Sequence, residues 1–287
     1  MYLSLKESAD FSINIKFSDS LNQFYNIISE LLNLDITQDM KKPLLWIAEN
    51  EADAENCRAV KSPLINNIFK YRFKDKFYFL KRPAENNNKL WYASSLQQIL
   101  LAISFVVHNE LIPEGGIPIH SLVLEYKGQG VLLVGKSGSG KTTSYKKIQP
   151  PWKALSDDHA FIVKKGNKYR LHPFVTISEC LETNNPIPRD LNFFVPLKMI
   201  FFLNKSEKDE VILINQSQAA YEFYNAAIAL IKFYYKNFTT NPELKSFRTN
   251  IFNNACDIIK SVPSFQLNAS LGGRFWEKIQ ERLDYDI

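Results

Sequence analysis

Residues 130–142 read Gly-Val-Leu-Leu-Val-Gly-Lys-Ser-Gly-Ser-Gly-Lys-Thr, and this stretch determines how the rest of the chain is interpreted. The apolar residues 131–134 predict a buried strand, and residues 142–149, before Pro150-Pro151, predict a short helix. Between them, residues 135–142 fit the pattern G-x-x-x-x-G-K-[ST]. Glycines let such a loop curl its backbone N–H groups around a phosphate. The stretch therefore predicts a nucleotide site on an α/β fold.

The loop also predicts the nucleotide contacts and the cofactors. We expect Lys141 to reach the β- and γ-phosphates of ATP, and the Thr142 hydroxyl to hold Mg²⁺. The residues expected to bind the nucleotide are Gly135, Ser137, Gly138, Ser139, Gly140, Lys141, Thr142 and Thr143.

Two adjacent carboxylates follow a second strand candidate at 154–156. Asp157 and Asp158 come sixteen residues after Lys141, which favours a position near the loop. Phosphoryl transfer to a hydroxyl uses one carboxylate as proton acceptor and another to bind Mg²⁺, and we expect Asp158 in the metal role. Ser-Asp-Asp-His is also good turn chemistry, so a structural turn is the alternative. His120, ahead of the apolar residues 122–124, is a further candidate to contact phosphate or acceptor, or a structural histidine.

Length, composition and charge set the class of protein. The chain has 287 residues, and its 35 Lys+Arg exceed its 30 Asp+Glu by 5. This mild surplus suits a polyanionic ligand such as a nucleotide but does not by itself indicate nucleic-acid binding. The longest apolar stretch, residues 99–107, is too short to span a membrane, and the N-terminus does not resemble a secretory signal. Cys57, Cys180 and Cys256 fit no zinc or disulfide pattern, so we expect a cytoplasmic protein.

The remaining patterns predict a mixed α/β chain in two parts, residues 1–110 and 111–287. Residues 70–82 hold six Lys/Arg among aromatic residues, and we interpret them as a solvated edge hairpin rather than a nucleic-acid grip. Residues 221–235 carry a stripe of Tyr and Ile that predicts a helix face in the core. Strands are expected at 11–17, 44–48, 68–73, 77–80, 117–126, 160–163, 169–172, 198–203, 211–214 and 265–269. Helices are expected at 21–32, 96–107, 217–236, 242–261 and 274–283.

The order and spacing of these motifs resemble the HPr kinase/phosphorylase superfamily. The resemblance lies in residues 116–121, in 128–135 with the loop that follows, and in Asp157-Asp158, and covers about residues 115–175. It implies a core of mixed sheets shared with ATP-dependent phosphoenolpyruvate carboxykinase, with an N-terminal α+β extension. By the same resemblance, His120, Lys141, Asp157 and Asp158 line the active site, and Asp157 is the base.

A second resemblance concerns the C-terminal half. His172-Pro173-Phe174, residues 195–203 and the tail from Phe265 to Trp276 are similar to HPr kinase-related proteins of peptide-modification gene clusters, the SynChlorMet cassette and lasso-peptide kinase types. Two departures from the HPr kinases count against HPr as substrate. The loop ends in Lys-Thr-Thr instead of Lys-Ser-Glu, and no Glu-x-Arg-Gly-Leu-Gly follows, where this chain has Glu179 and Glu182 as candidate extra contacts.

The sequence is compatible with three functional hypotheses. The first is a Mg²⁺- and ATP-dependent kinase acting on a Ser or Thr hydroxyl of a peptide or protein. The second is a kinase of a small hydroxyl compound, such as a free amino acid or sugar, and the third is a nucleotide-binding regulator without an acceptor. The sequence leaves the oligomeric state open, a homo-oligomer included.

Overall fold

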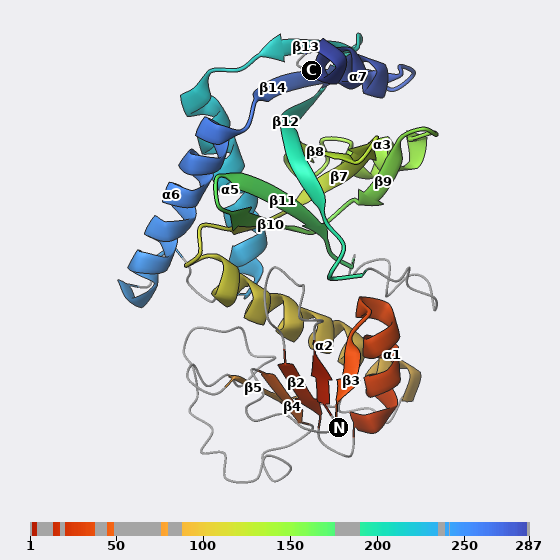
Figure 1. The fold of residues 1–287 in the computed structure, drawn as a ribbon, viewed down its shortest axis with the longest axis vertical. Coiled ribbons are helices and arrows are strands. Elements are labelled where there is room, and N and C mark those ends of the chain that lie inside the picture. The colour runs from red at the N-terminus through yellow and green to blue at the C-terminus, as the bar shows by residue number, and fades with distance from the viewer. Residues whose placement is uncertain are drawn as a thin grey trace. The chain divides into compact units, whose positions relative to one another are not determined.

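The computed structural model describes residues 2–4, 14–17, 21–37, 45–48, 76–79, 88–175, 190–234, 239–240 and 242–285. The chain forms two compact units (Figure 1), and both combine helices with a sheet of mixed strand direction, which confirms the mixed α/β class. One unit comprises residues 1–113, 175–193 and 232–242, and the other comprises 114–174, 194–231 and 243–287. The predicted domains, 1–110 and 111–287, stay a prediction, because a compact unit is not by itself an independently folding domain.

The first unit contains a five-stranded sheet of order β3-β1-β2-β4-β5. Its strands are β1 (Tyr2–Ser4), β2 (Asn14–Phe17), β3 (Asp35–Thr37), β4 (Leu45–Ala48) and β5 (Lys76–Phe79). Helix α1 (Asn22–Leu32) buries its predicted apolar stripe, and α2 (Asn88–Leu111) is buried nearly all round over residues 96–107, as its composition predicts. Of the expected basic hairpin, β5 is described and pairs in parallel with β4, while residues 68–73 lie outside the described residues.

The second unit contains a nine-stranded sheet, in which the path β6-β10-β11-β12-β8-β7-β9 is extended by β14, beside β12, and β13, beside β14. The strands are β6 (Ile117–Ile119), β7 (Ser121–Tyr126), β8 (Gln129–Val134), β9 (Lys153–Ser156), β10 (Ala160–Lys165), β11 (Lys168–Pro173), β12 (Val195–Lys205), β13 (Glu210–Leu213) and β14 (Ser264–Ala269). The helices are α3 (Lys141–Lys147), α5 (Gln216–Tyr234), α6 (Lys245–Ser261) and α7 (Phe275–Tyr285). A short 3₁₀ turn, η3 (Pro242–Leu244), precedes α6.

Three parallel strands form the part of this sheet that matters for the site. β12 pairs in parallel with β8 on one side, with Phe202 opposite Val134, and with β14 on the other side, with Phe202 opposite Gln266. Because parallel strands end at the same edge, the loops after β8, β12 and β14 leave the sheet together. The phosphate-loop sequence is the loop after β8.

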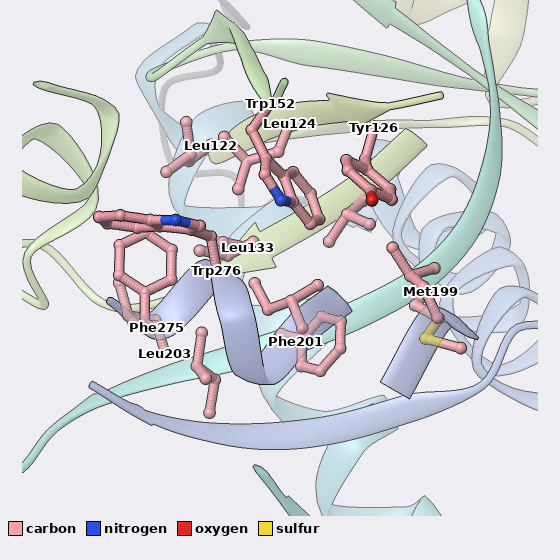
Figure 2. Close-up of a cluster of buried hydrophobic side chains, with 14 of the residues drawn as sticks. Leu122, Leu124, Tyr126, Leu133, Trp152, Met199, Phe201, Leu203, Phe275 and Trp276 are labelled. Carbon is pink, nitrogen blue, oxygen red and sulfur yellow. The ribbon is translucent and has the colours of Figure 1, made fainter. Parts of the chain in front are cut away.

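A buried apolar cluster covers one face of these strands. Figure 2 shows α7 contributing Phe275 and Trp276, which pack over Leu133 of β8 and over Phe201 and Leu203 of β12. The cluster continues along β7, and Tyr126 there stacks on Trp152 with ring centroids 4.7 Å apart. Tyr145 and Ile148 of the α3 region pack against it. The cluster therefore fixes α3 and the strand before the loop to one rigid support.

Two predictions are wrong in detail. The single strand expected at 117–126 is two strands, because the chain changes partners at His120: β6 pairs with β10, and β7 pairs with β8 and β9. On α5, Ile228 and Ile231 of the predicted core stripe are buried, but Tyr221 is 66% exposed, and the buried face also includes Ala219, Phe223 and Ala227. Within the described residues, no helix is both long and apolar enough to cross a membrane.

Candidate functional site

The break at His120 brings the site together. On one side of it, Ile119 of β6 lies opposite Ala160, which follows the acidic pair by two residues. On the other side, Ser121 of β7 lies opposite Val134, the last residue before the phosphate-loop sequence. His120 therefore stands where the start of the loop and the segment containing Asp157 and Asp158 meet.

The loop itself is tightly curled. Gly138 and Gly140 have φ of +78° and +105°, in the left-handed region that favours glycine. The backbone N–H of Ser139 donates to the Lys136 carbonyl at 3.0 Å, closing a turn within the loop. A Cβ on Gly135 would collide with the Ser139 side chain and lie 3.3 Å from the Leu203 carbonyl. The loop thus closes on itself and packs on the end of β12 in a way that requires glycine at its first position.

Lys141 points back into the loop. Its side chain is buried, and its Nζ donates to the Gly135 carbonyl at 2.7 Å and to the Lys136 carbonyl at 3.3 Å. Burial lowers the pKa of the Lys141 ammonium, and the negative charges of Asp158 and then Asp157 oppose this shift. Both aspartates therefore lie within electrostatic reach of the loop lysine.

Asp158 and His120 form a close pair. The Nδ1 of His120 lies 2.8 Å from the Asp158 carboxylate and 2.8 Å from the Asp158 carbonyl. Because a carbonyl only accepts, Nδ1 carries the hydrogen, and the Nε2 of a neutral ring is an acceptor. Burial alone would raise the pKa of the Asp158 carboxyl, but the hydrogen bond from His120, together with the positive charge of Lys141, holds that pKa below its usual value. Asp158 is thus stabilised as an anion.

The turn that carries the two aspartates is fixed from behind. The Ser156 hydroxyl donates to the carbonyls of His159 at 2.9 Å and Phe174 at 3.2 Å, and the Phe174 N–H donates to the His159 carbonyl at 3.0 Å. The pairing of β9 with β7 shifts register between Val123 and Leu124, just before the turn. Register shifts of this kind redirect the side chains that follow, here the half-buried Asp157 and Asp158.

His159 is a member of this site that the sequence analysis missed. Its side chain is buried, and its ring meets the rings of Phe161 and Phe174 edge-on, with centroids 4.8 and 5.1 Å away. Burial lowers the pKa of His159 to about 3, although the nearby Asp158 favours the charged form. A neutral ring packs directly behind the acidic pair, and the sequence signal for it is only the position after Asp158.

The remaining predicted contacts lie at the surface of the loop. Ser137, Gly138, Thr142 and Thr143 are exposed, so their polar groups are accessible to a ligand.

Among the residues that the structure describes, no group of three or more His, Cys, Asp and Glu could hold a metal ion on its own. The oxygen donors predicted for the metal are the hydroxyl of Thr142 and a carboxylate of the acidic pair. Hard oxygen donors of this kind fit Mg²⁺, which protein sites commonly hold through one or two carboxylates together with phosphate oxygens. Glu179 and Glu182 lie outside the described residues.

Comparison with known proteins identifies one family. The family model described as SynChlorMet cassette protein ScmC matches residues 85–284, more than half of the chain, including the whole of the loop and the acidic pair. No curated protein matches the chain.

Proposed function

The chain belongs to the family of the SynChlorMet cassette protein ScmC, and from this premise together with the site geometry we propose that it is a kinase of the HPr kinase-like superfamily. The family description names a cassette and no reaction. The proposed reaction transfers the γ-phosphate of ATP, with Mg²⁺, to a Ser or Thr hydroxyl of a peptide or protein.

The observation that carries the proposal is the interaction of Lys141 with both carboxylates. A glycine loop with a buried lysine suits the phosphates of a nucleotide, and two acidic groups within electrostatic reach of that lysine suit phosphoryl transfer. A loop that only held a nucleotide would not need a carboxylate kept ionised by a histidine at 2.8 Å. The match to the ScmC family spans these residues.

The two aspartates divide the work. Asp158 is the poorer proton acceptor, because its pKa is held below the usual value, and it is the better ligand for a cation together with Thr142. Asp157 then takes the proton. Bound Mg²⁺ supplies charge neutralisation for the phosphates. His120, held by Asp158 through Nδ1, presents Nε2 on the opposite side of its ring.

Asp157 accepts the proton of the acceptor hydroxyl while the acceptor oxygen uses the released electron pair to bond to the γ-phosphorus. The bond between the γ-phosphorus and the bridging oxygen breaks, and ADP leaves with that bond's electron pair. Lys141 and the loop N–H groups neutralise the charge that develops on the phosphate oxygens.

The acceptor class rests on the resemblance to kinases of peptide-modification clusters. A precursor peptide made by the ribosome is the form of acceptor that we propose, in the cytoplasm, where ATP is supplied. Purified protein incubated with labelled ATP against a peptide library and against a metabolite pool should label a peptide. Labelling only of a free amino acid or sugar would replace this acceptor with a small one, and partner-stimulated ATP hydrolysis without any acceptor would make the protein a regulator.

A variant pair tests the role of Asp157. We expect Asp157→Asn to abolish transfer while leaving the affinity for ATP within a few-fold of the unaltered protein, because the amide cannot accept the proton. Asp284→Asn, an exposed position on α7, is the matched control and should transfer normally. Transfer by Asp157→Asn at the rate of the control would remove Asp157 as the base.

A further inference from the structure

The end of β12 runs beside the phosphate loop. β8 leaves the sheet after Val134, which lies opposite Phe202, whereas β12 continues for three more residues to Lys205. Over those residues β12 stays paired with β14, and Lys205 lies opposite Ala269. The side of β12 from which β8 has departed therefore faces the loop instead of a strand.

Two close approaches show that the loop occupies this space. The Leu203 carbonyl lies 3.3 Å from where a Cβ of Gly135 would stand, at the beginning of the loop. The Cε of Lys205 lies 4.0 Å from where a Cβ of Gly140 would stand, at its end. The aliphatic part of Lys205 thus passes the last glycine of the loop, directly before Lys141.

Pairing within the sheet fixes the backbone of Lys205, whereas its charged side chain is exposed. Its backbone is fixed by pairing with β14, and the neighbouring Asn204 amide donates to the Asn268 side chain at 3.2 Å. The alternation of β12 places Lys205 on the face of Met199, Phe201 and Leu203, the same face against which the α3 region packs. Its side chain is exposed, and among the described residues it makes no ion pair.

We propose that Lys205 binds the phosphates of the nucleotide, as a second cation of the site and from the side opposite the aspartates. The inference rests on the proposed function. Lys141 already donates to two loop carbonyls and interacts with two carboxylates, so it neutralises only part of the charge of a triphosphate. Lys205 approaches from β12, whereas His120 and Asp158 approach from the β7 and β9 side. A flexible ammonium beside a glycine is suited to a phosphate oxygen, which needs no fixed direction of approach.

Equilibrium binding of a fluorescent, ribose-labelled ATP analogue with Mg²⁺ tests this assignment. We expect Lys205→Met to weaken binding about tenfold, the loss of one charge-assisted contact, and Lys205→Arg to retain most of the affinity. Lys208→Met, an exposed lysine three residues further along, is the control and should bind as the unaltered protein does. The thermal midpoint without nucleotide should not change, because Lys205 is exposed.

The outcomes separate this inference from the proposed function. Affinity of Lys205→Met equal to that of the unaltered protein, or an equal loss in Lys208→Met, would overturn the assignment of Lys205 alone. Absence of ATP binding by the unaltered protein would overturn the proposed function and this inference with it.

Discussion

His159 lies buried behind the acidic pair, and its pKa of about 3 makes a quantitative prediction about stability. The unfolded chain binds a proton at this residue near pH 6.5, whereas the folded protein resists it until about pH 3. Below pH 6.5 the unfolded state therefore holds one more proton than the folded state, and the free energy of unfolding falls by about 1.4 kcal/mol per pH unit. Between pH 7.5 and pH 5.0, His159 should thus cost about 2 kcal/mol of stability.

The variant that isolates this effect is His159→Phe. Phenylalanine suits the neighbouring rings of Phe161 and Phe174 and carries no titrating group. The difference in the free energy of unfolding between variant and unaltered protein should therefore change by about 2 kcal/mol, in favour of the variant, from pH 7.5 to pH 5.0. Asp158 stays ionised over this range in both proteins, because its pKa is held below the usual value.

Urea unfolding followed by tryptophan fluorescence, without nucleotide or divalent cations, measures this difference at the two pH values. The part of the difference in free energy that does not change with pH reports only the changed contacts of the ring. A difference that is the same at both pH values would refute the reasoning, since it would mean that His159 takes up its proton in the folded protein as readily as in the unfolded chain.

Two further variants test how the loop is supported. Gly135→Ala should lose roughly 1–3 kcal/mol of stability and most of the ATP affinity, because its Cβ would collide with the Ser139 side chain. The control is Gly166→Ala, whose Cβ would meet nothing within 4 Å and which should change only stability. Equal ATP affinity in the two variants would contradict the close approach of Gly135 and Ser139. Lys147→Met should lower the free energy of unfolding by about 1–2 kcal/mol, because Lys147 donates to the carbonyls of Ser270, Leu271 and Gly273. The control is the exposed Lys146→Met, and an equal effect of both lysine variants on the urea midpoint would show that these carbonyl contacts do not stabilise the fold.

Local patterns in the sequence predicted the strand, loop and helix around Gly135, because these features depend on residues that are neighbours in the chain. The strands β12 and β14 were also predicted from apolar runs, with ends that differ by a few residues. The parallel pairing of β12 with β8 and with β14 was not predicted, since it joins segments about seventy and sixty residues apart. The function of Lys205 depends on that pairing, so no motif in the sequence could indicate it.

The errors have physical causes of the same kind. Residues 117–126 are apolar on both sides of His120, so nothing local marks the change of partner from β10 to β8. On α5 the large side chain of Tyr221 suggested a core position, whereas the buried face includes the small residues Ala219 and Ala227, which contribute little to an apolar pattern. The burial of His159 depends on Phe174, fifteen residues away, and a single sequence does not show that contact.

The placement of β6 and β7 has a consequence for how this protein tolerates change. The two strands adjoin in the chain, but β6 ends the strand path at one side and β7 stands next to the other end. Residue 120 is therefore the single link between two strands, and the pairing of β6 with β10 and of β7 with β8 fixes the distance that this link covers. A different side chain at residue 120 would alter the chemistry of the site. One inserted residue would instead turn β7 over, so that Ser121 and Glu125 would lie on the opposite, apolar face of the strand. That face now holds Leu122, Leu124 and Tyr126. Between β6 and β7, the number of residues is therefore more tightly constrained than their identity.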